Sequence, residues 1–88
     1  MGSFDIIRTD TFLNDLKKLR KITELLRELD KKIQRLKQEP QSIGKELRGE
    51  LHPSRSTRVY MKYRLIFQID EKNKKVYLEA IDHRKDVY

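Results

Sequence analysis

The sequence has 88 residues, enough for one domain and too few for two independent hydrophobic cores. It contains no cysteine and only two histidines, which excludes disulfide scaffolds, thiol nucleophiles and cysteine-ligated metals and argues against a histidine-rich metal site. The formal net charge of +7 favours nucleic acid or an acidic protein as partner. Without an apolar stretch of roughly 20 residues or a signal-peptide pattern, the chain is expected to be cytoplasmic, with no membrane contact, metal or cofactor.

The N-terminal half is predicted to form a strand and two amphipathic helices. Residues 4–8 are a short, mostly apolar run, and the segment 9–11 that follows offers side chains that cap a helix. Helical spacing then brings apolar residues to one face, first in residues 12–19 and more regularly in residues 22–36. Pro40 ends the second helix, because the residue before a proline avoids the α region.

The C-terminal half is predicted to form three strands, because beyond Pro53 the apolar residues recur at every second position. The predicted strands are residues 56–60, 63–69 and 76–81. Residues 40–53 are predicted to be a loop with a short turn at 45–47, and residues 82–88 a polar tail. The order β-α-α-β-β-β predicts an α+β fold: two N-terminal helices pack on one face of a small antiparallel sheet, the first strand joins an edge, and the other face stays open.

The open face is where a cluster of basic side chains is predicted. Arg64 alternates away from the apolar residues of its own strand, and Arg58 lies on the preceding strand of the same hairpin. Further candidates nearby are Arg55, His83, Arg84, Lys85 and Tyr88. Arginine makes permanently charged, bidentate contacts with phosphate, histidine moves protons near neutral pH and tyrosine stacks on bases. The cluster therefore suits a phosphate-bearing ligand, although each basic residue taken alone is also typical of a solvated surface.

Four passages, in chain order, resemble the RelE/ParE superfamily of toxins from type II toxin–antitoxin systems. The passages are residues 11–19, 45–49, 58–70 and 83–88. The most specific are Tyr-Arg-Leu-Ile-Phe at 63–67 and His-Arg-Lys-Asp-Val-Tyr at 83–88. Together the four passages extend over nearly the whole chain.

The resemblance implies a metal-free endoribonuclease that cuts mRNA in the ribosomal A site by attack of a 2′-OH on its neighbouring phosphate. Arg64 matches the family's arginine at the scissile phosphate, and Arg84 its terminal arginine. Tyr88 matches the terminal tyrosine, and His83 stands where many relatives have histidine. The predicted catalytic residues are thus Arg64, His83, Arg84 and Tyr88, and the predicted RNA-binding residues are Arg55, Arg58, Lys62 and Lys85.

The resemblance also implies partners. These are a cognate antitoxin, acidic or amphipathic and RelB-like, and mRNA on the ribosome; the toxin–antitoxin complex is expected to bind its operator DNA through the antitoxin. Two other functions stay open: a ParE-like inhibitor of DNA gyrase that cuts nothing, and an inactive relative that only binds its antitoxin. The strand before Tyr63 carries arginines where the ribosome-dependent prototype has two lysines, so base catalysis falls to His83 or to no dedicated group.

Overall fold

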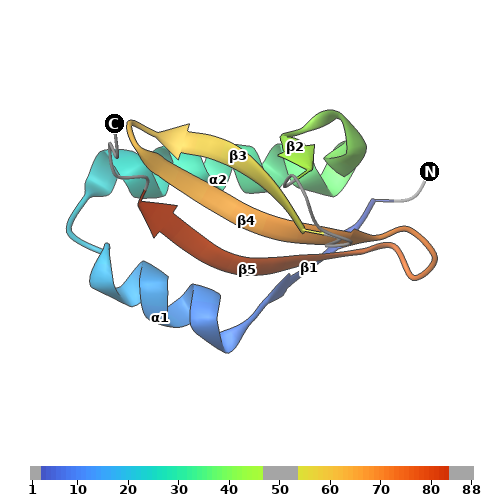
Figure 1. The fold of residues 1–88 in the computed structure, drawn as a ribbon, viewed down its shortest axis with the longest axis horizontal. Coiled ribbons are helices and arrows are strands. Elements are labelled where there is room, and N and C mark those ends of the chain that lie inside the picture. The colour runs from blue at the N-terminus through green and yellow to red at the C-terminus, as the bar shows by residue number, and fades with distance from the viewer. Residues whose placement is uncertain (1–2, 47–53, 84–88) are drawn as a thin grey trace.

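The computed structural model describes residues 3–46 and 54–83. Its elements are β1 (Asp5–Arg8), α1 (Asp10–Lys18), α2 (Thr23–Gln38), a short 3₁₀ turn (Pro40–Ser42), β2 (Lys45–Glu46), β3 (Ser54–Tyr60), β4 (Tyr63–Asp70) and β5 (Lys75–His83). In Figure 1 α2 lies behind the sheet and α1 runs beside β5. The predicted α+β fold, with both helices preceding the main strands, is confirmed.

The sheet has five strands in the order β1-β5-β4-β3-β2. Strands β3, β4 and β5 form the predicted antiparallel meander. β1 joins the edge as expected, but it runs parallel to β5, so the sheet is mixed. The backbone N–H of Phe4 donates to the Lys37 carbonyl and that of Asp5 to the Lys74 carbonyl, each at 2.8 Å, which holds the start of β1 between α2 and the β4–β5 hairpin.

Two local predictions differ from the structure. Lys45 and Glu46, predicted as part of a turn, form an edge strand paired with Ser56 and Arg55 of β3. The predicted polar tail starts too early, because Asp82 and His83 continue β5 opposite β4. In both places pairing with a neighbouring strand extends regular structure into polar residues, and such pairing leaves no periodic signal in a segment this short.

The core lies between the helices and one face of the sheet. Its fully buried side chains include Phe12 of α1, Leu25 and Leu36 of α2, Leu65 and Phe67 of β4, and Val76 and Leu78 of β5. The apolar stripe predicted in α2 is therefore confirmed as core. Leu13, one residue after Phe12, is 45% exposed, because consecutive helical residues point about 100° apart.

Side-chain hydrogen bonds attach α1 to β5. Thr9 Oγ1 accepts from the Phe12 N–H at 3.3 Å, the N-cap bond that the sequence predicts for this segment. The same hydroxyl donates to the Leu78 carbonyl at 2.7 Å. Further along the helix the Ile81 N–H donates to Asp15 Oδ2 at 3.0 Å. These bonds attach α1 to β5 at Leu78 and at Ile81.

The β4–β5 hairpin is closed by Asp70 and Asn73. Asp70 accepts hydrogen bonds from the Asn73 side-chain amide at 2.9 Å and from its backbone N–H at 3.2 Å. These bonds, the side-chain one first, lower the pKa of Asp70 below its usual range. A carboxyl whose pKa is lowered by folding stabilises the fold above its unfolded pKa, and this contribution is lost as pH falls through the folded pKa.

Asn73→Ala is expected to raise the pKa of Asp70 toward its ordinary value, because the variant keeps the backbone donor and lacks the side-chain donor. Protonation of Asp70 at low pH should then remove less of the unfolding free energy in the variant than in the wild type. NMR titration of the Asp70 carboxyl carbon measures the change, with Asn14→Ala, at an exposed position of α1, as control. An Asp70 pKa that stays the same in the Asn73 variant would contradict the assignment.

Candidate functional site

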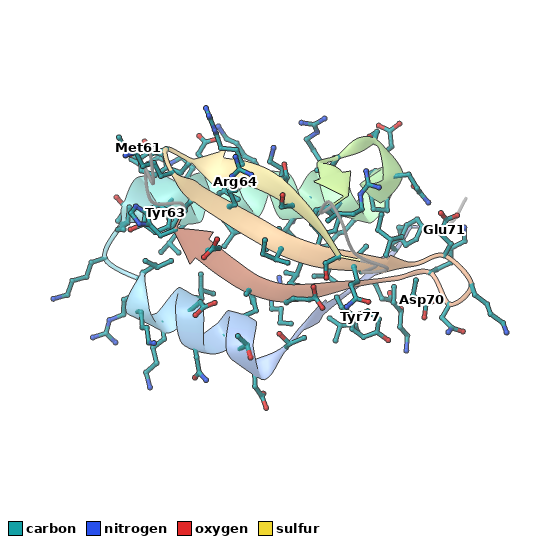
Figure 2. The ribbon with its side chains drawn as sticks, viewed as in Figure 1. Met61, Tyr63, Arg64, Asp70, Glu71 and Tyr77 are labelled. Carbon is teal, nitrogen blue, oxygen red and sulfur yellow. The ribbon has the colours of Figure 1, made fainter. Side chains whose placement is uncertain are left out.

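The two faces of β4 differ in character. Leu65 and Phe67 are fully buried against the helices, whereas Arg64, between the two apolar side chains Tyr63 and Leu65, points to the open face of the sheet. Residues directly opposite one another on neighbouring strands share a face. Arg58 of β3 and Asp82 of β5 are the residues opposite Arg64, and they therefore lie on the open face too. Figure 2 views this face and shows Arg64 in front of the sheet.

Arg58 and Arg64, the arginine pair, form a candidate anion-binding feature of the open face. Directly opposite side chains on antiparallel strands have Cβ atoms about 4.5–5.5 Å apart, and like charges so placed repel. Among the side chains of residues 3–44 and 54–83, neither guanidinium has a carboxylate in ion-pair range. A phosphate group between the two would relieve the repulsion and accept bidentate hydrogen bonds from each.

Lys62 adds a positive charge at the same end of the sheet. It is exposed in the turn that joins β3 to β4, next to Met61, which is labelled in Figure 2. The turn lies between the strands predicted at residues 56–60 and 63–69. The structure thus brings Arg58 and Arg64 together on the open face, with Lys62 at the same end of the sheet.

His83 occupies the same end of the sheet but faces the other side. It is opposite Tyr63, and the two rings lie with centroids 4.7 Å apart. Tyr63 alternates with Leu65 and Phe67, so both rings are on the helix-covered side. His83 is exposed as the last residue of β5, at the position adjacent to the one opposite Arg64. The structure therefore does not bring the imidazole onto the face of the arginine pair.

Arg55 is separated from the arginine pair by its hydrogen bonds. Its guanidinium donates to the carbonyl oxygens of Gln41, Ile43 and Gly44, at 3.1–3.3 Å. At Gly44, which has a φ of 74°, this segment lies directly against the backbone of β3. A Cβ built there would lie 2.5 Å from the Ser56 carbonyl oxygen. Arg55 thus fastens the segment before β2 to β3, a role that its predicted function in RNA binding did not include.

Arg84, Lys85 and Tyr88 lie outside the described residues, so their predicted roles stay predictions. In the part of the chain whose side chains are described (3–44 and 54–83), no three histidine, aspartate or glutamate side chains gather into a group that could hold a metal ion. No helix in this part of the chain is long and apolar enough to cross a membrane.

Glu79 is a polar residue of the open face that was not among the predicted site residues. The pairing of β4 with β5 shifts between Ile66–Ala80 and Phe67–Leu78, so Glu79 is the additional residue of a β-bulge. The signal is present in the sequence: the buried residues Val76, Leu78 and Ile81 break the period of two at this point. Its carboxylate accepts hydrogen bonds from Ser54 Oγ, at 2.5 Å, and from Gln68 Nε2.

Two comparisons of the sequence with known proteins both find toxins. Residues 6–88 match the family model described as ParE toxin of type II toxin-antitoxin system, parDE. Toxin RelG of Mycobacterium tuberculosis is 42% identical over 53 residues, which is 60% of this chain and 60% of that protein.

Solved structures agree with the sequence comparisons. The toxin–antitoxin complex RelBE2 of Mycobacterium tuberculosis contains a chain with a TM-score of 0.76 and 34% identity, covering 98% of this chain and 97% of that one. The YoeB/ParE toxin of Agrobacterium tumefaciens has a TM-score of 0.79 at 13% identity over 93% of this chain and 100% of its own, which shows the shared fold. The chain therefore belongs to the RelE/ParE superfamily of toxins of type II toxin–antitoxin systems.

Proposed function

We propose that this toxin is an endoribonuclease that cleaves mRNA in the ribosomal A site. The observation that carries the proposal is the arginine pair, Arg58 and Arg64, directly opposite each other on the open face without carboxylate partners among the described residues. Two adjacent guanidinium groups suit the phosphate of an RNA linkage better than any neutral ligand.

The proposed reaction uses no metal. The 2′-oxygen attacks the adjacent phosphorus while the bond from phosphorus to the 5′-oxygen breaks, leaving a 2′,3′-cyclic phosphate and a 5′-OH. A base removes the 2′-OH proton, and an acid protonates the leaving oxygen. The phosphorane that forms carries additional negative charge, and fixed positive groups already in position are an effective way to stabilise it. Arg64, with Arg58, has this role in our proposal.

His83 is the proposed proton-transfer residue. Its ring lies beside Tyr63 on the helix-covered side, so in this role the imidazole meets RNA that passes around the end of the sheet from the face of the arginine pair. A general acid or base raises the reaction rate about 10²–10⁴-fold. The proposal therefore gives proton transfer a group of its own, separate from the arginine pair. Arg84 is proposed as a second phosphate contact, Tyr88 as the stacking residue and Lys85 as an RNA contact, as the family resemblance implies.

The proposed partners are an acidic or amphipathic, RelB-like antitoxin and mRNA on a ribosome in the cytoplasm. The similar RelBE2 chain was solved in a toxin–antitoxin complex, and a net charge of +7 favours an acidic partner. A shallow hollow lined by Lys17, Lys18, Arg20 and Lys21 at the end of α1 adds nonspecific attraction for RNA phosphates. Operator DNA is proposed to be bound through the antitoxin of the complex.

Inhibition of DNA gyrase without RNA cleavage is the second candidate function. It is favoured by the family model, whose description names the ParE toxin. The same fold can serve both functions, so architecture does not decide between them.

Mapping RNA 5′ ends after induced expression separates the two candidates. The ribonuclease proposal expects growth arrest with new ends inside coding sequences, each carrying a 5′-OH and absent from uninduced cells. Growth arrest with DNA damage signalling and no new RNA ends would contradict the ribonuclease proposal and support gyrase inhibition.

A further inference from the structure

Glu79, at the bulge of β5, gives the open face a carboxylate. Gln68 lies on the open face because it follows the fully buried Phe67 in β4. Glu79 is hydrogen-bonded to Gln68, so its carboxylate lies on the same face. Tyr77 is directly opposite Gln68 and therefore shares the face as well. Glu79, Gln68 and Tyr77 are all half-buried and form what we term the acidic subsite.

Hydrogen bonds fix the direction of the Glu79 carboxylate. Ser54, whose exposed fraction is 0%, donates to Oε1 at 2.5 Å, and the Gln68 side-chain amide donates to Oε2. Both donors are neutral, and no lysine or arginine side chain described by the structure, in 3–44 and 54–83, pairs with Glu79. Each carboxylate oxygen has a second lone pair, so the group can still accept one hydrogen bond on each oxygen.

A negative charge on this face needs a reason if the face binds RNA. It repels phosphates, and a neutral glutamine could also bond to both neighbours, accepting from Gln68 Nε2 and donating to Ser54 Oγ. A carboxylate is, however, the right acceptor for base N–H groups, and base edges of single-stranded RNA are read in this way beside aromatic rings. Guanine is the base whose Watson–Crick edge presents two neighbouring N–H donors, matching two carboxylate oxygens; the other bases place an acceptor there.

We infer that the acidic subsite binds a guanine base of the substrate RNA, with Glu79 accepting from its N1 and N2 groups and Tyr77 providing a surface for stacking. This inference rests on the proposed ribonuclease function and adds base recognition to it. The subsite lies toward the β4–β5 hairpin and Arg64 toward the β3–β4 turn, as Figure 2 shows for Tyr77 and Arg64. Arg64 and Gln68 are about 13 Å apart along β4 at ~3.3 Å per residue, so one short RNA strand can contact both.

The test is binding of short RNA oligomers that differ in one base. The oligomers are uridine-rich, carry 2′-O-methyl ribose so that they are not cleaved, and have guanine, hypoxanthine or adenine at the central position. The wild-type protein is expected to bind the guanine oligomer about tenfold or more tighter than the adenine oligomer by fluorescence anisotropy. Hypoxanthine, which lacks the N2 amino group, should give an intermediate affinity.

Glu79→Gln is expected to reduce the guanine preference to within about twofold, because the amide offers only one acceptor oxygen. Glu71→Gln is the matched control, since it removes the same charge from an exposed position in the β4–β5 hairpin and should keep the wild-type ratio. Tyr77→Ala should weaken binding of all three oligomers and keep their order, which separates stacking from hydrogen bonding. Amide NMR spectra confirm that each variant is folded.

The outcomes distinguish this inference from the function on which it rests. Binding without base preference, or a preference that Glu79→Gln retains, would overturn the guanine subsite and leave RNA binding in place. Failure of the wild-type protein to bind any of the oligomers would overturn the subsite together with direct RNA recognition by the isolated toxin.

Discussion

Arg64→Ala is expected to abolish growth arrest and RNA cleavage while the protein stays folded. The substitution removes one guanidinium of the arginine pair at the point where negative charge develops in the proposed reaction. Loss of a single well-placed group of this kind costs about 10²–10³-fold in rate, enough to bring a toxin expressed at moderate level below the threshold for arrest. Arg64 is half-buried on the open face, so truncation leaves the packing of Leu65 and Phe67 intact.

Conservative and matched variants show whether charge alone is sufficient. Arg64→Lys keeps the charge and loses the bidentate contact, so its cleavage rate should fall between wild type and Arg64→Ala. Arg27→Ala is the control, because Arg27 is an exposed arginine of α2 whose partner is Glu24, at 3.3 Å. Growth curves, mapped RNA 5′ ends and thermal unfolding are measured for each. An Arg64→Ala protein as toxic as Arg27→Ala would remove the arginine pair from the mechanism.

Leu65→Ala is expected to have the largest effect on stability. Leu65 lies in the middle of the core face of β4 and has no exposed surface. Removing a fully buried leucine side chain costs about 2–5 kcal/mol of unfolding free energy, from lost burial and the cavity that remains. Since a domain of this kind is stable by only about 5–15 kcal/mol, the variant should unfold at a markedly lower urea concentration.

Leu13→Ala makes the same chemical change at a position that is 45% exposed, so it serves as the control. Its unfolding free energy should stay close to that of the wild type, within about 0.5–1 kcal/mol. Urea unfolding of both variants is followed by circular dichroism. Their unfolding free energies are compared with the same dependence on urea concentration, the m-value. Equal destabilisation by both substitutions would mean that the core described between the helices and β4 is wrong.

The sequence by itself determined the two helices and the four longer strands, and which of their faces is buried. Helical spacing in residues 22–36 identified the face of α2 that is buried, and alternation in β4 separated Arg64 from Leu65 and Phe67. Burial acts on each side chain locally, so it leaves a period in the sequence that can be read without knowing the neighbours. The passages at 58–70 and 83–88 likewise indicated the toxin family that the comparisons then showed.

Only the tertiary structure decided which side chains meet. It put Arg58 opposite Arg64 and His83 against Tyr63. It also bonded Arg55 to backbone carbonyl oxygens, and Glu79 to Ser54 and Gln68. Strand register and a bulge are set by hydrogen bonds between residues far apart in the chain, and a shift of one position moves a side chain to the opposite face. A residue type and its place in a strand therefore indicate a possible role, while the pairing with neighbouring strands determines its partner.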